Sequence, residues 1–152
     1  MIKLTRNLGP TGGAFADRLR LDCESRSRAR LRVRLESGAE AGLFLEYGKT
    51  LAQGDILAAD DGFLVRVECE PEAVITAHAK DWGLLARGCY HLGNRHVPLQ
   101  IGELWLRFTP DPVLEKLVRQ LGFVAVPETA PFTPETGAYA SGHGHDGGGR
   151  HG

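Results

Sequence analysis

Residues 111–122, Asp111-Pro-Val-Leu-Glu-Lys-Leu-Val-Arg-Gln-Leu-Gly122, contain the signals of a complete amphipathic helix. Asp111 is a typical N-cap, and Pro112 is a typical first-turn residue. Gly122 is the residue type that most often ends a helix in the left-handed conformation. Apolar side chains between them recur at steps of three and four: Val113, Leu114, Leu117, Val118 and Leu121. This apolar stripe predicts a helix that packs against another element.

The segments before and after this helix alternate between strand and helix patterns. An earlier amphipathic helix is predicted over residues 81–93, where apolar positions recur at helical spacing: Trp82, Leu85, Cys89 and Leu92. Strands are predicted at residues 72–76, 99–102, 103–108 and 123–126. The resulting order, β-α-β-β-α-β, is typical of two helices packed on one face of an antiparallel sheet. We place this second domain at residues 72–140.

The first 71 residues have the short alternating segments of a small β-domain. The clearest strand is predicted over Arg26–Leu35, in which five arginines alternate with apolar residues: Arg26, Arg28, Arg30, Arg32 and Arg34. Further strands are predicted at residues 42–47, 55–59 and 63–69, with Asp61-Gly62 as a hairpin turn. The chain as a whole is therefore predicted to be of the α+β class.

Composition limits the classes of function. The 152 residues are 42% hydrophobic and 24% charged, as in globular proteins, and the formal charge of -1 gives no overall attraction to nucleic acid or anionic membrane. No apolar run approaches the roughly 20 residues that span a bilayer. The N-terminus lacks the apolar core of a signal peptide. We therefore expect a cytoplasmic protein with no membrane or nucleic-acid partner.

Residues 141–152 are predicted to form a disordered tail, because this segment contains six glycines and no apolar core residues. It carries half of the six histidines: His143, His145 and His151. The run His-Gly-His-Asp offers two imidazoles and a carboxylate, ligand types that suit nickel, copper or zinc. The alternatives are a hydrophilic chain end without function and the remnant of a purification tag.

His96 follows Leu92 by four residues and extends the apolar stripe of the 81–93 helix. Spacing alone favours a hydrogen-bonded residue of the core or of the C-terminal turn. One imidazole is a poor metal site, although a two-fold axis through a homodimer would present it twice. His91 lies roughly 140° away around a helix and does not naturally chelate the same ion.

Three segments resemble the UreE family of urease accessory nickel carriers. The most distinctive is Gly88-Cys-Tyr-His-Leu-Gly-Asn-Arg-His-Val-Pro-Leu-Gln-Ile101. Leu43-Phe-Leu-Glu-Tyr-Gly-Lys-Thr-Leu-Ala-Gln-Gly-Asp-Ile-Leu57 is similar to the N-terminal domain of that family, and Phe132–Ala140 resembles its C-terminal end. The resemblance covers nearly the whole chain.

The resemblance implies an N-terminal domain of peptide-binding type and a ferredoxin-like metal-binding domain that forms a homodimer. It assigns His96 as the interfacial Ni²⁺ ligand, and the tail histidines as additional ligands. The implied function is delivery of Ni²⁺ to the urease apoprotein and its accessory complex, which includes a GTPase, and not catalysis. Zn²⁺ and Cu²⁺ are expected competitors. Some relatives have a His-x-His pair before the second helix, where this chain has Pro110-Asp111-Pro112.

Two other classes of function are compatible with the pattern. An RNA-binding module would need stacking aromatics on the sheet, for which Trp105 and Phe108 are the candidates. A metal-dependent hydrolase would need a general base beside the metal, and the sequence supplies none. The arginine face of Arg26–Arg34 would dock an acidic partner or RNA, or else form a solvated face paired with Glu68 and Glu70.

Overall fold

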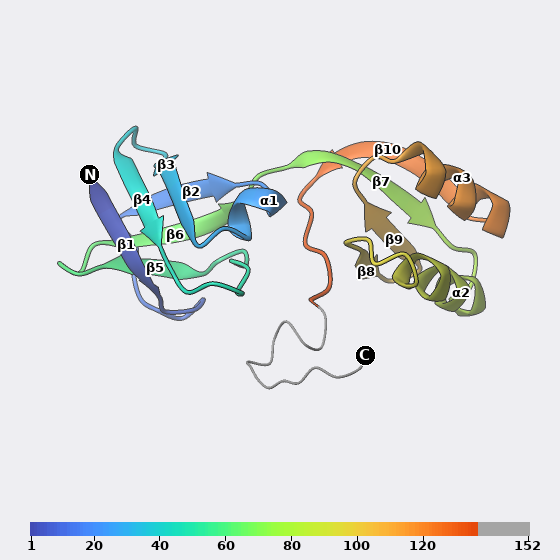
Figure 1. Cartoon of the computed structure of the whole chain (residues 1–152), viewed down its shortest axis with the longest axis horizontal. Helices are drawn as coiled ribbons and strands as arrows, with labels where there is room; N and C mark the ends of the chain where they lie inside the picture. Colours follow the sequence, from blue (N-terminus) through green and yellow to red (C-terminus); the bar gives the residue numbers. More distant parts are fainter. Residues whose placement is uncertain (137–152) are drawn as a thin grey trace. The chain divides into compact units, whose positions relative to one another are not determined.

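The computed structural model describes residues 1–136, which contain two compact units, here called unit 1 (Met1–Glu70) and unit 2 (Pro71–Glu135) (Figure 1). The tail at residues 141–152, with its three histidines, lies outside the described residues. No helix within residues 1–136 combines the length and apolar character needed to span a membrane.

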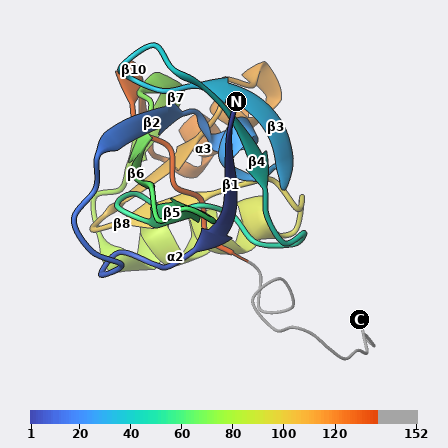
Figure 2. The same cartoon turned by 90° about the vertical axis from the view of Figure 1, so that its left-hand side faces the viewer.

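Unit 1 is a six-stranded sheet with the order β2-β6-β5-β1-β4-β3. Its elements are β1 (Ile2–Asn7), β2 (Asp17–Leu21), α1 (Cys23–Arg26), β3 (Arg30–Arg34), β4 (Glu40–Phe44), β5 (Ile56–Ala59) and β6 (Leu64–Cys69). The pairs β1-β4 and β2-β6 are parallel and the others antiparallel. Figure 2 shows β1, β4 and β3 side by side. The core consists of buried aliphatic side chains from these strands, including Leu4, Leu19, Leu43, Leu57 and Val65.

The predicted strand Arg26–Leu35 is wrong at its beginning. Arg26 belongs to α1 and is completely buried, so it does not share a face with the other arginines. The carboxylate of Asp22 caps α1 by accepting a hydrogen bond from the Ser25 amide at 2.8 Å, and such local bonds compete with strand pairing. From Arg30 onward the predicted alternation is confirmed, because the arginines are exposed and Val33 is buried.

Unit 2 consists of β7 (Glu72–His78), α2 (Trp82–Gly93), β8 (Gln100–Gly102), β9 (Trp105–Phe108), α3 (Pro112–Leu121) and β10 (Val124–Ala130). The element order is the predicted one. The sheet has the order β10-β7-β9-β8 and is antiparallel throughout. β10 continues through Pro127, beyond the predicted end at residue 126. Proline is tolerated there because β10 is an edge strand.

Both helices of unit 2 pack on the same face of the sheet. Leu85 and Leu92 of α2 share one buried cluster with Val118 of α3 and with Leu106 and Phe108 of β9. Full burial of each such side chain contributes roughly 1.5–3 kcal/mol. The predicted ends of α3 are confirmed by its caps.

At the start of α3, Asp111 Oδ1 accepts hydrogen bonds from the amides of Val113 and Leu114 at 2.9 and 3.3 Å. At its end, Gly122 has the left-handed φ of 113°. α2 begins in the same way, because the Asp81 carboxylate accepts from the Leu84 amide at 2.8 Å.

Candidate functional site

His96 lies three residues beyond the end of α2, in a turn that closes the helix. The amide of Arg95 donates to the carbonyl of Leu92 at 3.0 Å, and the amide of His96 donates to that of Gly93 at 3.1 Å. His96 itself has a left-handed backbone with φ of 57°, which it shares among non-glycine residues of the described chain only with Leu104. This conformation costs a non-glycine residue roughly 1–2 kcal/mol.

The imidazole of His96 is available for a ligand. The buried stripe of α2 ends at Leu92, and His96 is exposed. Within residues 1–136 no hydrogen bond or ion pair involves the His96 side chain. Spacing alone favoured a hydrogen-bonded residue of the core or of the C-terminal turn. The structure confirms the position in the turn, and the alternative of a core residue is wrong.

The other described histidines are not placed with His96 in a cluster. His91 is exposed on the last turn of α2, with its ring in edge contact with that of Tyr90 at 5.3 Å. His78 ends β7, opposite Trp105 of β9 and Val124 of β10. Across residues 1–136 no three metal-ligating side chains come together. The described part of the chain therefore supplies a single imidazole at the turn after α2.

The last segment of unit 2 packs next to this turn, by contacts that the sequence did not predict. We call Pro131–Glu135 the anchor segment. Phe132 is only 1% exposed. Thr133 donates its amide hydrogen to the Gln100 side-chain oxygen at 3.0 Å, and Glu135 donates its own to the Leu99 carbonyl at 2.7 Å. Since Leu99 is three residues after His96, the anchor segment leads the chain to the loop that carries this histidine. The signal for this packing in the sequence is Phe132, an aromatic residue between Pro131 and Pro134.

Arg107 holds the beginning of the anchor segment. Its guanidinium donates to the Pro131 carbonyl at 3.4 Å and to the Thr76 hydroxyl at 3.0 Å, and lies over the Trp105 ring at 4.4 Å. It also pairs with Glu128 at 3.5 Å. The hydrogen bond from Thr76 and then the charge of Arg107 hold the pKa of Glu128 below its usual range.

Cys89 of α2 is not prepared to act as a thiolate ligand. Burial, followed by the negative charge of Glu135, raises the pKa of the Cys89 thiol above its ordinary value. A thiol must lose its proton to bind a metal ion. Burial and the Glu135 carboxylate therefore both disfavour the thiolate form of Cys89.

The sheet of unit 2 offers little to a stacked base. Phe108 is 1% exposed and belongs to the helix-facing cluster. Trp105 is half-buried, and Arg107 already covers its ring. These positions disfavour the RNA-binding alternative, which depended on both aromatics.

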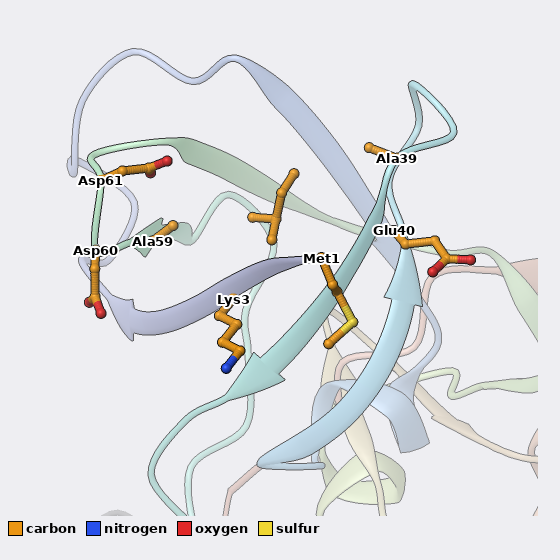
Figure 3. Close-up of a pocket in the computed structure, with 8 residues that line it drawn as sticks. Met1, Lys3, Ala39, Glu40, Ala59, Asp60 and Asp61 are labelled. Carbon is orange, nitrogen blue, oxygen red and sulfur yellow. The ribbon is translucent and has the colours of Figure 1, made fainter.

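Unit 1 has a hollow of about 600 Å³ at the N-terminus. Figure 3 shows Asp60 and Asp61 on one side of it, Glu40 on the other, and Lys3 and Met1 between them. It is lined by no histidine or cysteine. The hollow therefore lacks the imidazole or thiolate donors that favour nickel.

Comparison with known proteins agrees with this architecture. The family model described as UreE urease accessory protein, N-terminal domain, matches residues 2–70, and that of the C-terminal domain matches residues 72–152. Urease accessory protein UreE of Pseudomonas putida (strain GB-1) is 51% identical over 148 residues, covering 95% of this chain and 90% of that protein. UreE of Azotobacter vinelandii is 52% identical over 132 residues, or 86% and 80%, and UreE of Psychromonas ingrahamii is 42% identical over 146 residues, or 95% and 96%. The two-unit chain with an exposed histidine after α2 therefore belongs to the UreE family of urease accessory proteins.

Proposed function

We propose that this UreE protein is a nickel metallochaperone, which binds Ni²⁺ as cargo and delivers it for assembly of the urease metallocentre. The observation that carries the proposal is the exposed imidazole of His96, which has no partner within the described residues and lies in a strained left-handed turn. Strain of this kind persists where the surrounding structure enforces it and is concentrated at functional sites.

The proposed ligands are two copies of His96, one from each protomer of a homodimer, with His143, His145 and His151 of the tail. A single imidazole supplies one of the four to six donor atoms that nickel usually takes, and a two-fold axis supplies a second copy of it. The position of the anchor segment supports a contribution of the tail histidines to this site, because the segment leads the chain to the loop that carries His96. From Glu135 to His143 the chain has eight residues, which reach at most roughly 27 Å when extended.

The proposed domains are 1–71, an N-terminal domain of peptide-binding type, and 72–140, a ferredoxin-like domain through which the protein dimerises. The second assignment is supported by the sheet order, in which the fourth, first, third and second strands of the unit are neighbours, with both helices on one face. Residues 141–152 are proposed to be a disordered tail.

Delivery needs ligands that exchange. Imidazoles on a flexible tail can leave the ion one at a time, whereas a rigid cage would hold it. The proposed recipients are the urease apoprotein and its accessory complex with the GTPase, in the cytoplasm. In this role the protein acts as a carrier and not as an enzyme, with Zn²⁺ and Cu²⁺ as competing cargo.

The test is Ni²⁺ calorimetry on the full chain, on His96→Ala and on a chain truncated before Ser141. We expect His96→Ala to remove the tightest site and the truncation to lower the number of ions bound. His78→Ala, an exposed histidine of the same unit, is the matched control and should leave both quantities unchanged. Tight binding that survives His96→Ala would refute the interfacial site, and an unchanged stoichiometry after truncation would remove the tail from it.

A further inference from the structure

Glu135, the last residue of the anchor segment, has a carboxylate that the fold does not use. Within residues 1–136 no hydrogen bond or ion pair involves this side chain, which is exposed. Among the described residues of unit 2 the same holds for Glu103, in the turn between β8 and β9. Other carboxylates of the unit cap helices or pair with arginine: Asp81, Asp111, Glu115 and Glu128.

The Glu135 carboxylate lies beside the turn that carries His96. The Glu135 amide donates to the Leu99 carbonyl at 2.7 Å. Leu99 is three residues after His96, so their Cα atoms are at most roughly 11 Å apart. On the other side of the turn, the charge of Glu135 is the second cause, after burial, of the raised pKa of the Cys89 thiol. Cys89 is one helical turn before Gly93, whose carbonyl accepts from the His96 amide at 3.1 Å.

An imidazole and a carboxylate are both suitable donors for nickel. Ni²⁺ is commonly bound by nitrogen and oxygen donors in a square-planar or tetragonal arrangement. One chain supplies a nitrogen from His96 and an oxygen from Glu135, and a two-fold axis supplies both a second time. The four donors of such a pair of chains make a complete plane around the ion.

We propose that Glu135 binds the Ni²⁺ cargo together with His96, so that each protomer of the homodimer contributes one carboxylate and one imidazole. This inference rests on the proposed function and adds a ligand to its site. Because imidazole is neutral when it binds a metal ion, the two carboxylates balance the charge of Ni²⁺. The tail histidines then take the positions above and below the plane.

The test is Ni²⁺ calorimetry on the full chain carrying Glu135→Gln. This exchange keeps the backbone bond to Leu99 and removes the charge of the side chain. We expect it to weaken the tightest site at least about tenfold, since both protomers lose a ligand. Glu103→Gln is the matched control and should change the affinity less than about twofold. Circular dichroism checks that both variants are folded.

Glu103 is a suitable control because it lies at the opposite end of α2 from the His96 turn. The carbonyl of the next residue, Leu104, accepts from the amide of Ala79, just before α2 begins, at 2.8 Å. The 12 residues of α2 span roughly 18 Å. The two variants therefore remove the same charge from the same unit at different distances from the proposed site.

Infrared spectroscopy distinguishes a ligand from a nearby charge. Coordination of a carboxylate changes the separation between its symmetric and antisymmetric stretching bands. Addition of Ni²⁺ to the natural chain should therefore produce a carboxylate difference band, which Glu135→Gln lacks and Glu103→Gln keeps. In calorimetry, Glu135→Gln should cost less affinity in the His96→Ala background than in the natural chain, because the two residues act on one ion.

Different results would overturn the proposal in different ways. Unchanged nickel affinity in Glu135→Gln, while His96→Ala removes the tightest site, would exclude Glu135 and leave the proposed function intact. Weaker binding with an unchanged infrared band would make Glu135 a positioning residue that accepts a hydrogen bond from the His96 ring. A loss that disappears in about 0.5 M NaCl would reduce its role to long-range attraction, because salt screens separated charges. If His96→Ala itself leaves nickel binding unchanged, the proposed function fails, and this inference fails with it.

Discussion

The two units differ in how far apart in the sequence the residues lie that determine their structure. In unit 2 the sheet is antiparallel, and its two helices are delimited by residues adjacent in sequence, such as Asp111 and Gly122. In unit 1 the sheet depends on the parallel pairs β1-β4 and β2-β6, whose partners are far apart along the chain. Local signals therefore define the helices of unit 2, whereas the strand order of unit 1 depends on parallel pairs that have no local signal. Unit 2 also contains long-range contacts, because β7 pairs with β10 from the pair Glu72 and Ala130 to the pair His78 and Val124, and because the anchor segment bonds to Leu99 and Gln100.

The largest expected effect concerns this anchor segment. Phe132→Ala removes a ring that is almost completely buried, and we expect it to lower the free energy of unfolding of unit 2 by about 3 kcal/mol. The measurement is urea denaturation followed by the fluorescence of Trp82 and Trp105, both in unit 2. Tyr47→Ala, at an exposed aromatic residue of unit 1, is the control and should change this transition by less than about 0.5 kcal/mol. A loss below 1 kcal/mol for Phe132→Ala would mean that the anchor segment is not part of the cooperative unit.

A second prediction tests the packing of α2. A Cβ atom at Gly88 would collide with the Phe123 ring and would lie 2.8 Å from Leu106 Cδ1, whereas one at Gly93 would meet nothing within 4 Å. Gly88→Ala should therefore destabilise unit 2 by about 2 kcal/mol. Gly93→Ala should be neutral or stabilising by up to about 1 kcal/mol, because alanine favours helix. Thermal unfolding of the two variants measures this difference, and equal melting temperatures would contradict the close packing of α2 on the sheet.

A third prediction separates stability from metal binding at His96. Glycine adopts a left-handed backbone without strain, so His96→Gly should raise the free energy of unfolding by up to about 1 kcal/mol while removing the proposed nickel site. His91→Gly, within the last turn of α2, should instead cost up to about 1 kcal/mol. Chemical denaturation and Ni²⁺ calorimetry on both variants test this. Loss of stability in His96→Gly would show that the side chain contributes to the fold.

The smallest expected effect is a pH dependence in unit 1. The hydrogen bond from the Ser25 amide, followed by that from the Ser25 hydroxyl, holds the pKa of Asp22 below its usual value of 3.8. The unfolded chain therefore binds this proton more readily, and the contribution of Asp22 is present above about pH 4 and is lost as pH falls through the lower folded pKa. Asp22→Asn keeps the cap and should reduce the acid sensitivity by a few tenths of a kcal/mol. Urea titrations at pH 6 and pH 3 measure the free energy of unfolding of both proteins. If it changes by the same amount between the two pH values in the natural chain and in Asp22→Asn, the effect is excluded.

These contrasts explain what could be predicted. The ends of α3 and the order of elements in unit 2 follow from caps and periodicity. The burial of Arg26 could not be predicted, because a local cap at Asp22 competes with strand alternation and only the folded structure decides between them. The anchor segment could not be predicted either, because its hydrogen bonds to Gln100 and Leu99 span more than thirty residues.

The candidate metal site was partly accessible from sequence. The family resemblance selected His96 as a ligand, whereas spacing alone favoured a hydrogen-bonded residue of the core or of the C-terminal turn. Its backbone conformation and exposure were not predictable from spacing, since both depend on how the turn after α2 closes. The tail histidines lie outside the described residues and stay predictions.

The left-handed backbone of His96 has a consequence for how this chain can change over generations. Selection for folding alone favours glycine at that position, and a single residue exchange would provide it. In a lineage that no longer needs the proposed Ni²⁺ cargo, the histidine should therefore be replaceable, and glycine would be favoured at this position. Serial passage of a host without urease, followed by sequencing of this codon, would measure how strongly the proposed Ni²⁺ cargo maintains the residue.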